Sequence, residues 1–447
     1  MGKKYLIQTF GCQMNIHDSE QMGLLLEGAG YEATYLAQEA DLIILNTCSI
    51  REKAAQKVYS QLGRLDAVKR ENPDLIVGIG GCLAQQLGNQ FFKKAPCLDL
   101  VFGTQNIQRL PELLKTVEKN HIKVADTAVA KEGCVDNIRF IPKKGQIAAF
   151  VTIMRGCNNF CSYCVVPYLR GPEESRELED IIQEVEMLAN QGVKEITLLG
   201  QNVNSYGNSR HRTVHFHDLI RSIADIAGIE RIRFTTSHPK DLSLELMRCF
   251  ADVDKMCKHI HLPVQSGSDK ILQAMNRGYS KEDYLRKVNA LRAICPEISL
   301  TSDIIVGFPG EGDADFDETI DLMEKVRFDA LFSFKYSERA GTAAEKLEHK
   351  VTESIKSRRL RKLQSLQELY TLENNQKMLG KEVEVLVEGR SRNAADEVMG
   401  RTRTNKIVNF KGGLDLVGKM ESVMIIEAYQ HSLRAERLLD KEPCQCL

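Results

Sequence analysis

The sequence lacks an excess of charge of either sign, because 60 Lys and Arg residues stand against 61 Asp and Glu residues. A net charge near zero provides no global field to steer nucleic acid or a membrane surface, so any such surface must be local. The sequence also lacks an apolar leader after Met1, a long apolar span and any repeat or low-complexity tract. These absences point away from secretion, a transmembrane anchor and a solenoid fold, and we expect a cytoplasmic protein without membrane contact.

Cysteine, in contrast, is abundant, and its count of 13 is odd. Disulfides are rare in a reducing compartment, where abundant thiols favour metal binding or catalysis over a disulfide framework. The positions of the cysteines therefore guide the search for a functional site.

The length of 447 residues exceeds the usual size of a single core and predicts two or three domains. In residues 1–125, short apolar runs at 5–9, 42–45 and 75–79 alternate with amphipathic stretches, one of them a helix from about 18 to 29. This alternation predicts an N-terminal α/β domain built on a parallel sheet.

A second α/β series begins after a looser linker at 126–146. Six apolar runs separated by helical segments predict a partial (β/α)6 barrel, since a full eight-unit barrel needs a longer chain. A long polar helix near 352–377 trails this barrel, so the expected barrel domain covers 147–375. The six expected strands are 147–154, 195–199, 231–236, 259–262, 298–306 and 329–334.

Residues 378–437 alternate in strand fashion around several glycines, which predicts a small antiparallel, OB-like β-barrel. Its expected strands are 383–387, 397–410 and 422–429. Residues 438–447 are interpreted as a tail, so three domains account for most of the chain.

Cys157, Cys161 and Cys164 form a CxxxCxxC cluster directly after the first expected barrel strand. Three thiolates packed so closely cannot all be ordinary buried cysteines, and three ligands leave one iron of a cubane cluster free to bind a further group. An open coordination position is what a catalytic metal site needs. On spacing alone, zinc is the main alternative, followed by plain structural cysteines.

Cys12, Cys48 and Cys82 are far apart in sequence, but each follows directly on an expected strand of the N-terminal domain. All strands of a parallel sheet end on the same side, where open α/β folds place their ligands. Three thiols would then converge on one edge of the sheet. Buried free cysteines, which pack well in cores, are the alternative.

The CxxxCxxC motif at the end of the first barrel strand resembles that of the radical S-adenosylmethionine superfamily. The resemblance implies that Cys157, Cys161 and Cys164 hold a [4Fe-4S] cluster whose free iron binds S-adenosylmethionine. In that superfamily, reductive cleavage of the sulfonium gives a 5′-deoxyadenosyl radical that removes hydrogen from an unactivated carbon.

The same resemblance implies contacts between the barrel and S-adenosylmethionine, in which Tyr163 occupies the family's aromatic position beside the adenine. Tyr163 could instead be a packed barrel aromatic, and the other positions could be ordinary loops after strands. The expected contacts are Tyr163, Gly200, Gln201, Asn202, Ser237, Gln265 and Ser266.

Further segments extend the resemblance from about residue 4 to residue 436. Three of them match the N-terminal domain of methylthiotransferases: Phe-Gly-Cys-Gln-Met-Asn at 10–15, Asn-Thr-Cys-Ser-Ile-Arg at 46–51 and Gly-Gly-Cys at 80–82. The C-terminal barrel resembles the TRAM domain, an RNA-binding module. These matches imply a second [4Fe-4S] cluster, used in sulfur delivery, on Cys12, Cys48 and Cys82, and a substrate pocket that includes Gln13 and Asn15.

Methylthiotransferases modify isopentenyl-adenosine in tRNA, threonylcarbamoyl-adenosine in tRNA, or an aspartate of a ribosomal protein. The run Gly-Cys-Gln-Met-Asn at 11–15 resembles the first subfamily, the MiaB type. This implies methylthio transfer to carbon 2 of N6-isopentenyladenosine next to the anticodon, with two S-adenosylmethionine molecules per product and two [4Fe-4S] clusters. It also implies an electron donor of flavodoxin or ferredoxin type and a monomeric enzyme. The rivals are the sibling that acts on a ribosomal protein and a zinc-dependent tRNA-binding protein without redox chemistry.

Local basic concentrations are the places where an RNA phosphate surface can form. One lies on the helix near 352–377 and another in the C-terminal barrel, although a charge run is usually a solvated face. The expected tRNA contacts are Arg358, Arg359, Arg361, Lys362, Arg390, Arg392, Arg401 and Arg403.

One loop departs from the family pattern. Where the family has Tyr-Ser-x-Arg-Pro-Gly-Thr-Pro-Ala, residues 336–344 read Tyr-Ser-Glu-Arg-Ala-Gly-Thr-Ala-Ala. The loss of both prolines predicts a looser turn.

The remaining cysteines are expected to be structural or incidental, although the pair in the tail could bind metal. They are Cys97, Cys134, Cys249, Cys257, Cys295 and, in the tail, Cys444 and Cys446.

Overall fold

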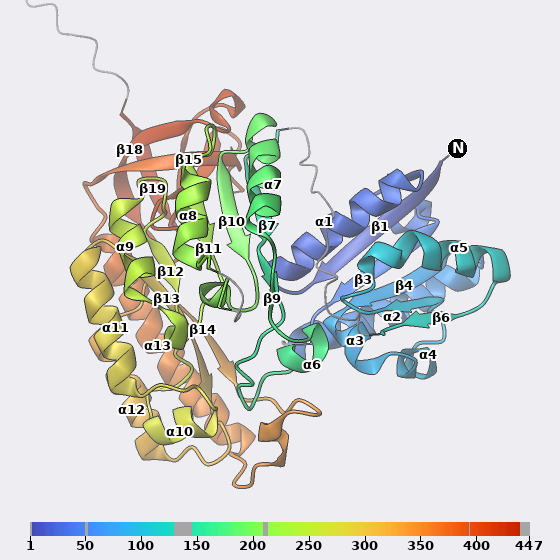
Figure 1. Ribbon diagram of the computed structural model, residues 1–447, viewed down its shortest axis with the longest axis horizontal. Coiled ribbons are helices and arrows are strands. Elements are labelled where there is room, and N and C mark those ends of the chain that lie inside the picture. The colour runs from blue at the N-terminus through green and yellow to red at the C-terminus, as the bar shows by residue number, and fades with distance from the viewer. Residues whose placement is uncertain (1, 50–51, 129–144, 209–212, 393, 439–447) are drawn as a thin grey trace, which may run out of the picture.

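The computed structural model describes residues 2–49, 52–128, 145–208, 213–392 and 394–438, which form three units along the chain (Figure 1). Most of the expected linker lies outside the described residues, as do Cys134, Cys444 and Cys446. Within the described ranges, no helix is both long and apolar enough to cross a membrane.

The N-terminal unit is a parallel sheet with the strand order β2-β1-β3-β4-β5-β6. Every residue of the central strand β3 is buried, as expected for a strand covered by helices on both faces. The predicted parallel α/β domain is confirmed. The strands are β1 (Lys3–Phe10), β2 (Tyr31–Ala33), β3 (Leu42–Thr47), β4 (Ile76–Gly81), β5 (Leu100–Phe102) and β6 (Val124–Asp126).

Helices cover both faces of this sheet, with one apolar cluster under α1 and α5 and a second under α2, α3 and α4. The helix expected from about residue 18 begins earlier, directly after Cys12, because residues 13–17 carry too mixed a pattern to signal a helix. The helices are α1 (Gln13–Gly28), α2 (Glu52–Glu71), α3 (Cys82–Leu87), α4 (Gln90–Lys94) and α5 (Leu110–Asn120), with short 3-10 turns η1 (Ala37–Glu39) and η2 (Ile107–Arg109).

The second unit is the predicted six-stranded open barrel. Its strands form two three-stranded parallel sheets, β11-β10-β7 and β12-β13-β14, and the pair Ile232 and Met256 bridges the gap between them. No described residue pairs β7 with β14, so the barrel is open there. The strands are β7 (Ala148–Thr152), β10 (Glu195–Leu199), β11 (Arg231–Phe234), β12 (His259–His261), β13 (Ser299–Val306) and β14 (Ala330–Lys335), with a small hairpin of β8 (Met154–Arg155) and β9 (Glu174–Ser175).

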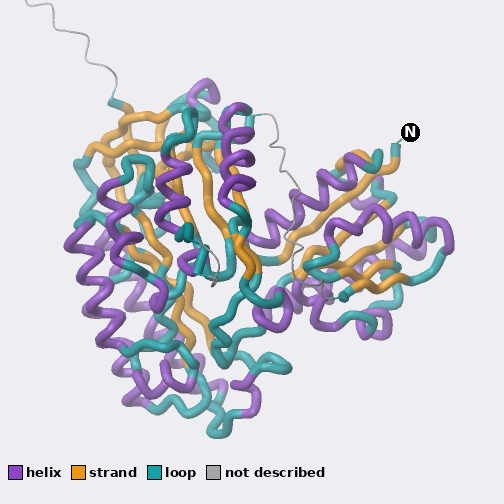
Figure 2. Tube along the Cα trace, viewed as in Figure 1, coloured by secondary structure: helices purple, strands orange, loops and turns teal. Residues whose placement is uncertain are grey.

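Helices form an outer layer around these strands (Figure 2). The helices are α6 (Val166–Arg170), α7 (Leu178–Asn190), α8 (Phe216–Ala224), α9 (Leu244–Asp252), α10 (Asp269–Ala274), α11 (Lys281–Ile294), α12 (Asp313–Val326) and α13 (Glu353–Gln376), with 3-10 turns η3 (Val203–Ser205), η4 (Pro239–Asp241) and η5 (Ala343–Lys346). The apolar residues of α7, α8, α9, α11, α12 and α13 and those of the strands make one continuous core.

The C-terminal unit is a closed barrel with the strand order β15-β16-β17-β19-β18. The stretch 397–410, expected as one run, is two strands joined by a turn in which Asn405 has φ +64°. One pair, β17 with β19, is parallel, so the barrel is not wholly antiparallel. The elements are β15 (Glu382–Arg390), β16 (Glu397–Thr402), β17 (Ile407–Lys411), η6 (Leu414–Leu416), β18 (Met420–Ala428) and β19 (Leu433–Arg437).

The small barrel packs against the amino-terminal end of β11 through buried arginines. Arg231 is 0% exposed and donates to the backbone oxygen of Arg401 at 2.5 Å and to Glu384 Oε1 at 3.1 Å. Arg233 donates to the backbone oxygen of Thr402 at 2.7 Å. Guanidinium groups thus join the two barrels across their contact.

The loop 336–344 is closed by hydrogen bonds in place of the family's prolines. Thr342 donates through both its amide and its hydroxyl to the backbone oxygen of Arg339, at 3.1 and 2.8 Å. The amide of Ala344 donates to the backbone oxygen of Ser162 at 2.8 Å, which docks the loop onto the central cysteine segment. The expected looseness of this turn stays a prediction.

We expect Ala343→Pro to raise the free energy of unfolding by about 0.4–1 kcal/mol. Ala343 is the first residue of η5, where a proline fits, and Thr342 before it already has the extended backbone that proline requires. Thermal unfolding followed by calorimetry measures the change. The matched control is Ala344→Pro, which removes the amide that binds Ser162 and should destabilise; equal effects of the two changes would contradict the explanation.

Candidate functional site

The three N-terminal cysteines lie at the same edge of the sheet. Cys12 follows β1, Cys48 follows β3 and Cys82 follows β4, and these strands are neighbours in the sheet. Cys48 and Cys82 are buried, whereas Cys12 is partly exposed. The edge placement expected from the sequence is therefore present.

Asn15 ties the loops that carry these cysteines. Its side-chain nitrogen donates to Asn46 Oδ1 at 3.1 Å and to the backbone oxygen of Thr47 at 3.3 Å, and its side-chain oxygen accepts from the amide of Cys12 at 3.3 Å. Asn15 is 0% exposed and does not line the large cavity described below, whereas Gln13 does. The structure thus shows Asn15 supporting the cysteine loops, and its place in a substrate pocket stays a prediction.

Gly81 lets the strand that precedes Cys82 approach its neighbour closely. Its φ is +91°, and a Cβ at this position would collide with the backbone of Thr47. A residue with a side chain would therefore push the Cys82 loop away from the Cys48 loop.

Cys157, Cys161 and Cys164 lie in the loop between the β8 strand and α6. The amide of Cys164 donates to the backbone oxygen of Cys161 at 2.9 Å, which folds the loop into a tight turn. Burial raises the pKa of the Cys164 thiol to about 12. Burial also raises the pKa of the Cys157 thiol, so Cys157 and Cys164 need a metal or a nearby cation to be held as thiolates.

Arg277 is the cation beside this set. Its Nη1 donates to Cys161 Sγ at 3.2 Å and to the Tyr163 hydroxyl at 3.3 Å, and its Nη2 donates to the backbone oxygen of Pro263 at 2.7 Å. The sequence did not predict Arg277 as a site residue, because a basic residue that stands alone in its segment gives no signal of a charged cluster.

The expected cofactor contacts follow the barrel strands β10, β11 and β12, as predicted. Three of them carry a buried polar atom without a hydrogen-bond partner among the described residues: Gln201 Nε2, Asn202 Oδ1 and Gln265 Oε1. Gln265 also has φ +74°, a backbone conformation that non-glycine residues rarely adopt. Buried polar atoms without a partner within the protein suit a polar ligand or a water molecule that would complete them.

The other expected contacts already have partners or packing within the protein. Ser237 donates to the backbone oxygen of His261, and Ser266 lies 3.4 Å from the hydroxyl of Thr319. Tyr163 packs against the apolar cluster of Ile271, Met275, Phe308, Tyr336 and Ala344, so its aromatic ring has a structural role as well. A Cβ on Gly200 would collide with the side chain of Met154. This glycine therefore allows the segment after β10 to pass close to β8.

Each cysteine set supplies three thiols, the number of protein ligands that holds a [4Fe-4S] cluster and leaves one iron open. Within the described ranges, no three His, Cys, Asp or Glu side chains lie close enough to hold one metal ion, as a tetrahedral zinc site requires. In a cubane, by contrast, each thiolate binds a different iron, so the sulfurs need not converge on one point. Each three-cysteine set could therefore hold a [4Fe-4S] cluster.

A cavity of about 500 Å³ connects all three units of the chain. Cys12, Gln13 and Cys48 of the N-terminal unit contribute to its lining, as do residues of the C-terminal barrel, Arg401 and Thr404–Ile407 among them. Its wall is formed by alternate residues of the barrel strands, which share one face because side chains alternate along a strand. These are His259 and His261 on β12, Ser299, Thr301 and Asp303 on β13, and Ala330, Phe332 and Phe334 on β14.

A buried ion pair joins the N-terminal unit to the barrel. Arg170, at the end of α6, donates to Asp18 of α1 at 2.7 Å, and both side chains are 6% exposed. Burial raises the pKa of the Cys82 thiol, and the Arg170 guanidinium opposes that rise, which places it near the N-terminal cysteines. Val165 and Leu169 also pack against Cys82.

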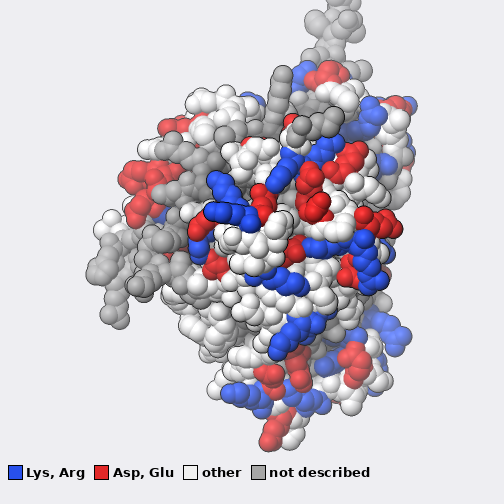
Figure 3. All heavy atoms as spheres, turned by 90° about the vertical axis from the view of Figure 1, so that its right-hand side faces the viewer, with Lys and Arg blue, Asp and Glu red and all other residues white. Residues whose placement is uncertain are grey.

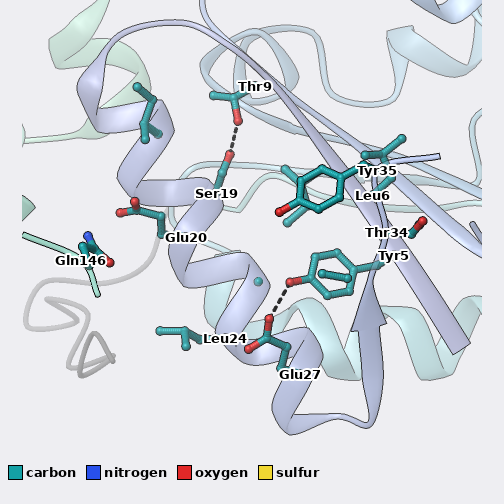
Figure 4. Close-up of a pocket in the computed structure, with 14 residues that line it drawn as sticks. Tyr5, Leu6, Thr9, Ser19, Glu20, Leu24, Glu27, Thr34, Tyr35 and Gln146 are labelled. Carbon is teal, nitrogen blue, oxygen red and sulfur yellow. Dashed lines mark hydrogen bonds between the residues drawn. The ribbon is translucent and has the colours of Figure 1, made fainter. Parts of the chain in front are cut away.

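Figure 4 shows a second cavity, of about 410 Å³, between α1 and the start of the sheet. Tyr5 donates to Glu27 there at 2.9 Å, and the hydroxyls of Thr9 and Ser19 lie 2.7 Å apart. None of the residues that line it is a cysteine, so it is separate from both cysteine sets.

Five of the expected tRNA contacts form ion pairs within the protein, two of them at the surface, where Arg358 pairs with Asp313 at 3.5 Å and Lys362 with Asp317 at 3.4 Å. Arg359 is 4% exposed and pairs with Glu311 at 2.8 Å, so it does not present its charge to RNA and that prediction is corrected. Arg401 and Arg403 pair with carboxylates of β15 at 3.1 and 3.0 Å. Five expected contacts are exposed: Arg358, Arg361, Lys362, Arg390 and Arg392. On the face shown in Figure 3, basic and acidic side chains are interspersed.

We expect Asp18→Asn to destabilise the metal-free protein by about 3–5 kcal/mol, because it leaves the Arg170 charge buried without its partner. Thermal unfolding gives the measurement, and replacement of both partners by apolar residues should recover most of the loss. The control is Glu421→Gln at the more exposed pair with Arg437, where at most about 1 kcal/mol is expected. If the Asp18 variant is as stable as this control variant, the result would contradict the importance of the buried ion pair between Asp18 and Arg170.

Three family models match consecutive parts of the chain. The model described as "Uncharacterized protein family UPF0004" matches residues 4–103, "Radical SAM superfamily" matches 151–323 and "TRAM domain" matches 376–438.

Curated relatives match almost the whole length. The tRNA-2-methylthio-N(6)-dimethylallyladenosine synthase of Syntrophus aciditrophicus is 59% identical over 442 residues, which cover 99% of this chain and 96% of that protein. The protein of the same name from Geobacter sulfurreducens is 51% identical, with 98% of each chain covered.

Solved structures share the fold. The radical S-adenosylmethionine methyltransferase TsrM of Kitasatospora setae, solved with cobalamin and a [4Fe-4S] cluster bound, matches with a TM-score of 0.56 and 15% identity over 77% of this chain and 74% of that chain. At this identity the likeness concerns the fold alone.

Proposed function

The chain belongs to the family of tRNA-2-methylthio-N(6)-dimethylallyladenosine synthases, and from this premise we propose how its residues serve that reaction. It is a tRNA methylthiotransferase that adds a methylthio group to carbon 2 of N6-isopentenyladenosine next to the anticodon. The structural observation that carries the proposal is the cavity that Cys12 and Cys48, the barrel strands and the C-terminal barrel line together.

S-adenosylmethionine, bound to a reduced [4Fe-4S] cluster, supplies the radical that such an enzyme needs. We assign the cluster in the barrel to Cys157, Cys161 and Cys164, with the unpartnered polar atoms of Gln201, Asn202 and Gln265 toward the cofactor. A second cluster, the sulfur-delivery site, is assigned to Cys12, Cys48 and Cys82. Two S-adenosylmethionine molecules per product follow, one for the methyl group and one for the radical.

The target adenosine is assigned to the large cavity. A volume of about 500 Å³ lies in the range of pockets that enclose small ligands, and enzymes that modify a base commonly bring it out of the stack. Phe332 and Phe334 of β14 are exposed aromatic side chains on its wall and are suited to stack on a base or on the isopentenyl group. Gln13 could then contact the base beside the sulfur-delivery site.

The surface that binds the rest of the tRNA is assigned to the exposed basic residues of α13 and β15 and the turn after it. Arg390 and Arg392 form no ion pair with any described residue, so their charges are available to phosphate. The C-terminal barrel is matched to the TRAM domain, and one of its turns lines the same cavity.

The electron donor, the oligomeric state and the location complete the proposal. The radical chemistry requires a one-electron donor, for which a flavodoxin or ferredoxin is proposed. A monomeric enzyme is proposed. The tRNA substrate suits a location in the cytoplasm.

Anaerobically reconstituted protein should hold about eight irons and eight sulfides per chain, as two cubanes require. Replacement of Cys157, Cys161 and Cys164 by Ala should halve both counts. Iron and sulfide analysis of the two proteins gives the measurement. A triple variant with the full iron complement would overturn these ligands, and colourless zinc-loaded protein would favour the rival zinc protein.

Loss of one cysteine set should also abolish a different step of the reaction from loss of the other. With Cys12, Cys48 and Cys82 changed to Ala, reductive cleavage of S-adenosylmethionine to 5′-deoxyadenosine should continue without methylthio product, whereas Cys161→Ala should abolish the cleavage itself. Chromatography of both nucleosides, with isopentenylated tRNA and a strong reductant, distinguishes the outcomes. Methylthio product from the N-terminal triple variant would exclude the sulfur-delivery assignment, and activity on a ribosomal protein alone would favour the sibling enzyme.

Affinity for tRNA should fall as salt rises, because binding of basic side chains to phosphates releases counterions. Arg390→Ala combined with Arg392→Ala should flatten the salt slope by about 1–2, since each arginine that binds a phosphate adds roughly one to the slope. Filter binding at several salt concentrations provides the measurement. Arg434→Ala, whose guanidinium is already paired with Glu397 at 2.6 Å, is the control and should leave the slope closer to that of the parent.

A further inference from the structure

Six arginine side chains are buried among the residues that the structure describes, and only Arg277 has no carboxylate partner there. Burial of an unpaired charge is costly, so such a cation needs a countercharge from another source. The other five pair at 2.6–3.1 Å: Arg170 with Asp18, Arg176 with Glu184, Arg231 with Glu384, Arg233 with Glu195 and Arg359 with Glu311.

The contacts of Arg277 are with groups that carry no charge in the thiol form of the protein. Nε donates to the Tyr279 hydroxyl at 3.0 Å, Nη2 donates to the backbone oxygen of Pro263 at 2.7 Å, and Nη1 donates to the Tyr163 hydroxyl and to Cys161 Sγ at 3.3 and 3.2 Å. Of these four partners, the sulfur of Cys161 is the one that becomes an anion when it binds iron.

We propose that Arg277 is a positioning residue whose guanidinium balances the charge of the central cysteine set through Cys161 and fixes the Tyr163 ring beside it. This inference rests on the proposed function, in which that set holds an iron-sulfur cluster. The buried guanidinium, which has no carboxylate partner among the described residues, then gains its countercharge from the cysteine sulfur that binds iron.

The arrangement has an electrochemical consequence. The reduction potential of an iron-sulfur cluster depends on its net charge and on the hydrogen bonds to its sulfurs. Reduction adds a negative charge, which a nearby guanidinium stabilises. Removal of the positive charge should therefore move the midpoint potential to more negative values and slow the electron transfer that starts the reaction.

The test uses the full chain with Cys12, Cys48 and Cys82 changed to Ala, so that only the central set can hold a cluster. Arg277→Gln removes the charge, and Arg277→Lys keeps it. Iron content and an anaerobic redox titration monitored by electron paramagnetic resonance are measured for each. We expect a more negative midpoint potential, or loss of iron, in the Gln variant, and a value nearer the parent in the Lys variant.

A matched control separates charge at the cluster from general damage to the core. Arg359→Gln removes another buried guanidinium, but its partners are Glu311 and Asp313 and no cysteine. This variant should lose thermal stability and yet keep the iron content and the midpoint potential of the parent.

A second readout applies if the variants bind iron poorly or unfold readily. The melting temperature is measured before and after anaerobic reconstitution of the parent and of Arg277→Met. A purely structural defect lowers both temperatures alike, whereas loss of the countercharge makes the increase on reconstitution smaller in the variant.

Three outcomes of these measurements would contradict parts of the argument. Suppose that the parent holds four irons and that the Arg277 variants keep both its midpoint potential and its increase in melting temperature on reconstitution. This result would overturn the inference and leave the proposed function standing. Equal loss of iron in the Lys and Gln variants would also overturn it, because packing and not charge would then be at work. A parent without iron would instead refute the cluster assignment itself.

Discussion

Parallel strand pairing sends the carboxyl ends of all strands in a sheet to the same edge, and both cysteine sets depend on this constraint. In the N-terminal unit, the neighbours β1, β3 and β4 each end at a cysteine. In the barrel, the segments after β10 and β12 carry Gln201, Asn202 and Gln265 with their unpartnered polar atoms, and the central cysteines follow the first barrel strand and its short hairpin strand. Two chemically different sites thus arise from the same topological rule.

Buried arginines join the units that carry these sites. Arg170 reaches from the segment after the central cysteines to Asp18 in the N-terminal unit, and Arg231 and Arg233 reach from β11 to the small barrel. A buried ion pair contributes little net stability but is costly to break. Such contacts therefore favour one docked arrangement of the three units over others, and the cavity exists only in that arrangement.

The cavity is lined by residues of all three units. The N-terminal unit contributes two thiols to its lining, the barrel contributes alternate residues of three strands, and the C-terminal barrel contributes residues of two turns. A base held there would lie against the N-terminal cysteines, while a tRNA bound to the outer basic residues would extend away from the barrel. Transfer of a group to one atom of a large RNA requires this combination of an enclosed pocket and an open surface.

Much of the fold and of the cysteine sites was predictable from the sequence, because both are signalled by residues close together in the chain. Short apolar runs predicted six barrel strands, and the cysteine after each of three N-terminal strands predicted their shared edge. The three-residue strands β2, β5 and β6 were missed, since so short a run shows no periodicity. Arg359 was wrongly placed on the surface, because a basic run on a helix does not reveal which face packs against the core.

The sequence by itself therefore determined the order of the three folds, the strand ends that carry cysteines and, through its motifs, the resemblance to one enzyme family. These properties depend on residues close together in the chain. Only the tertiary structure decided that Asn15 supports the cysteine loops, that Arg277 lies on Cys161 and that turns of the C-terminal barrel line the cavity. Each of these contacts joins segments far apart in sequence, and the burial that makes an unpaired charge costly exists only once those segments have packed together.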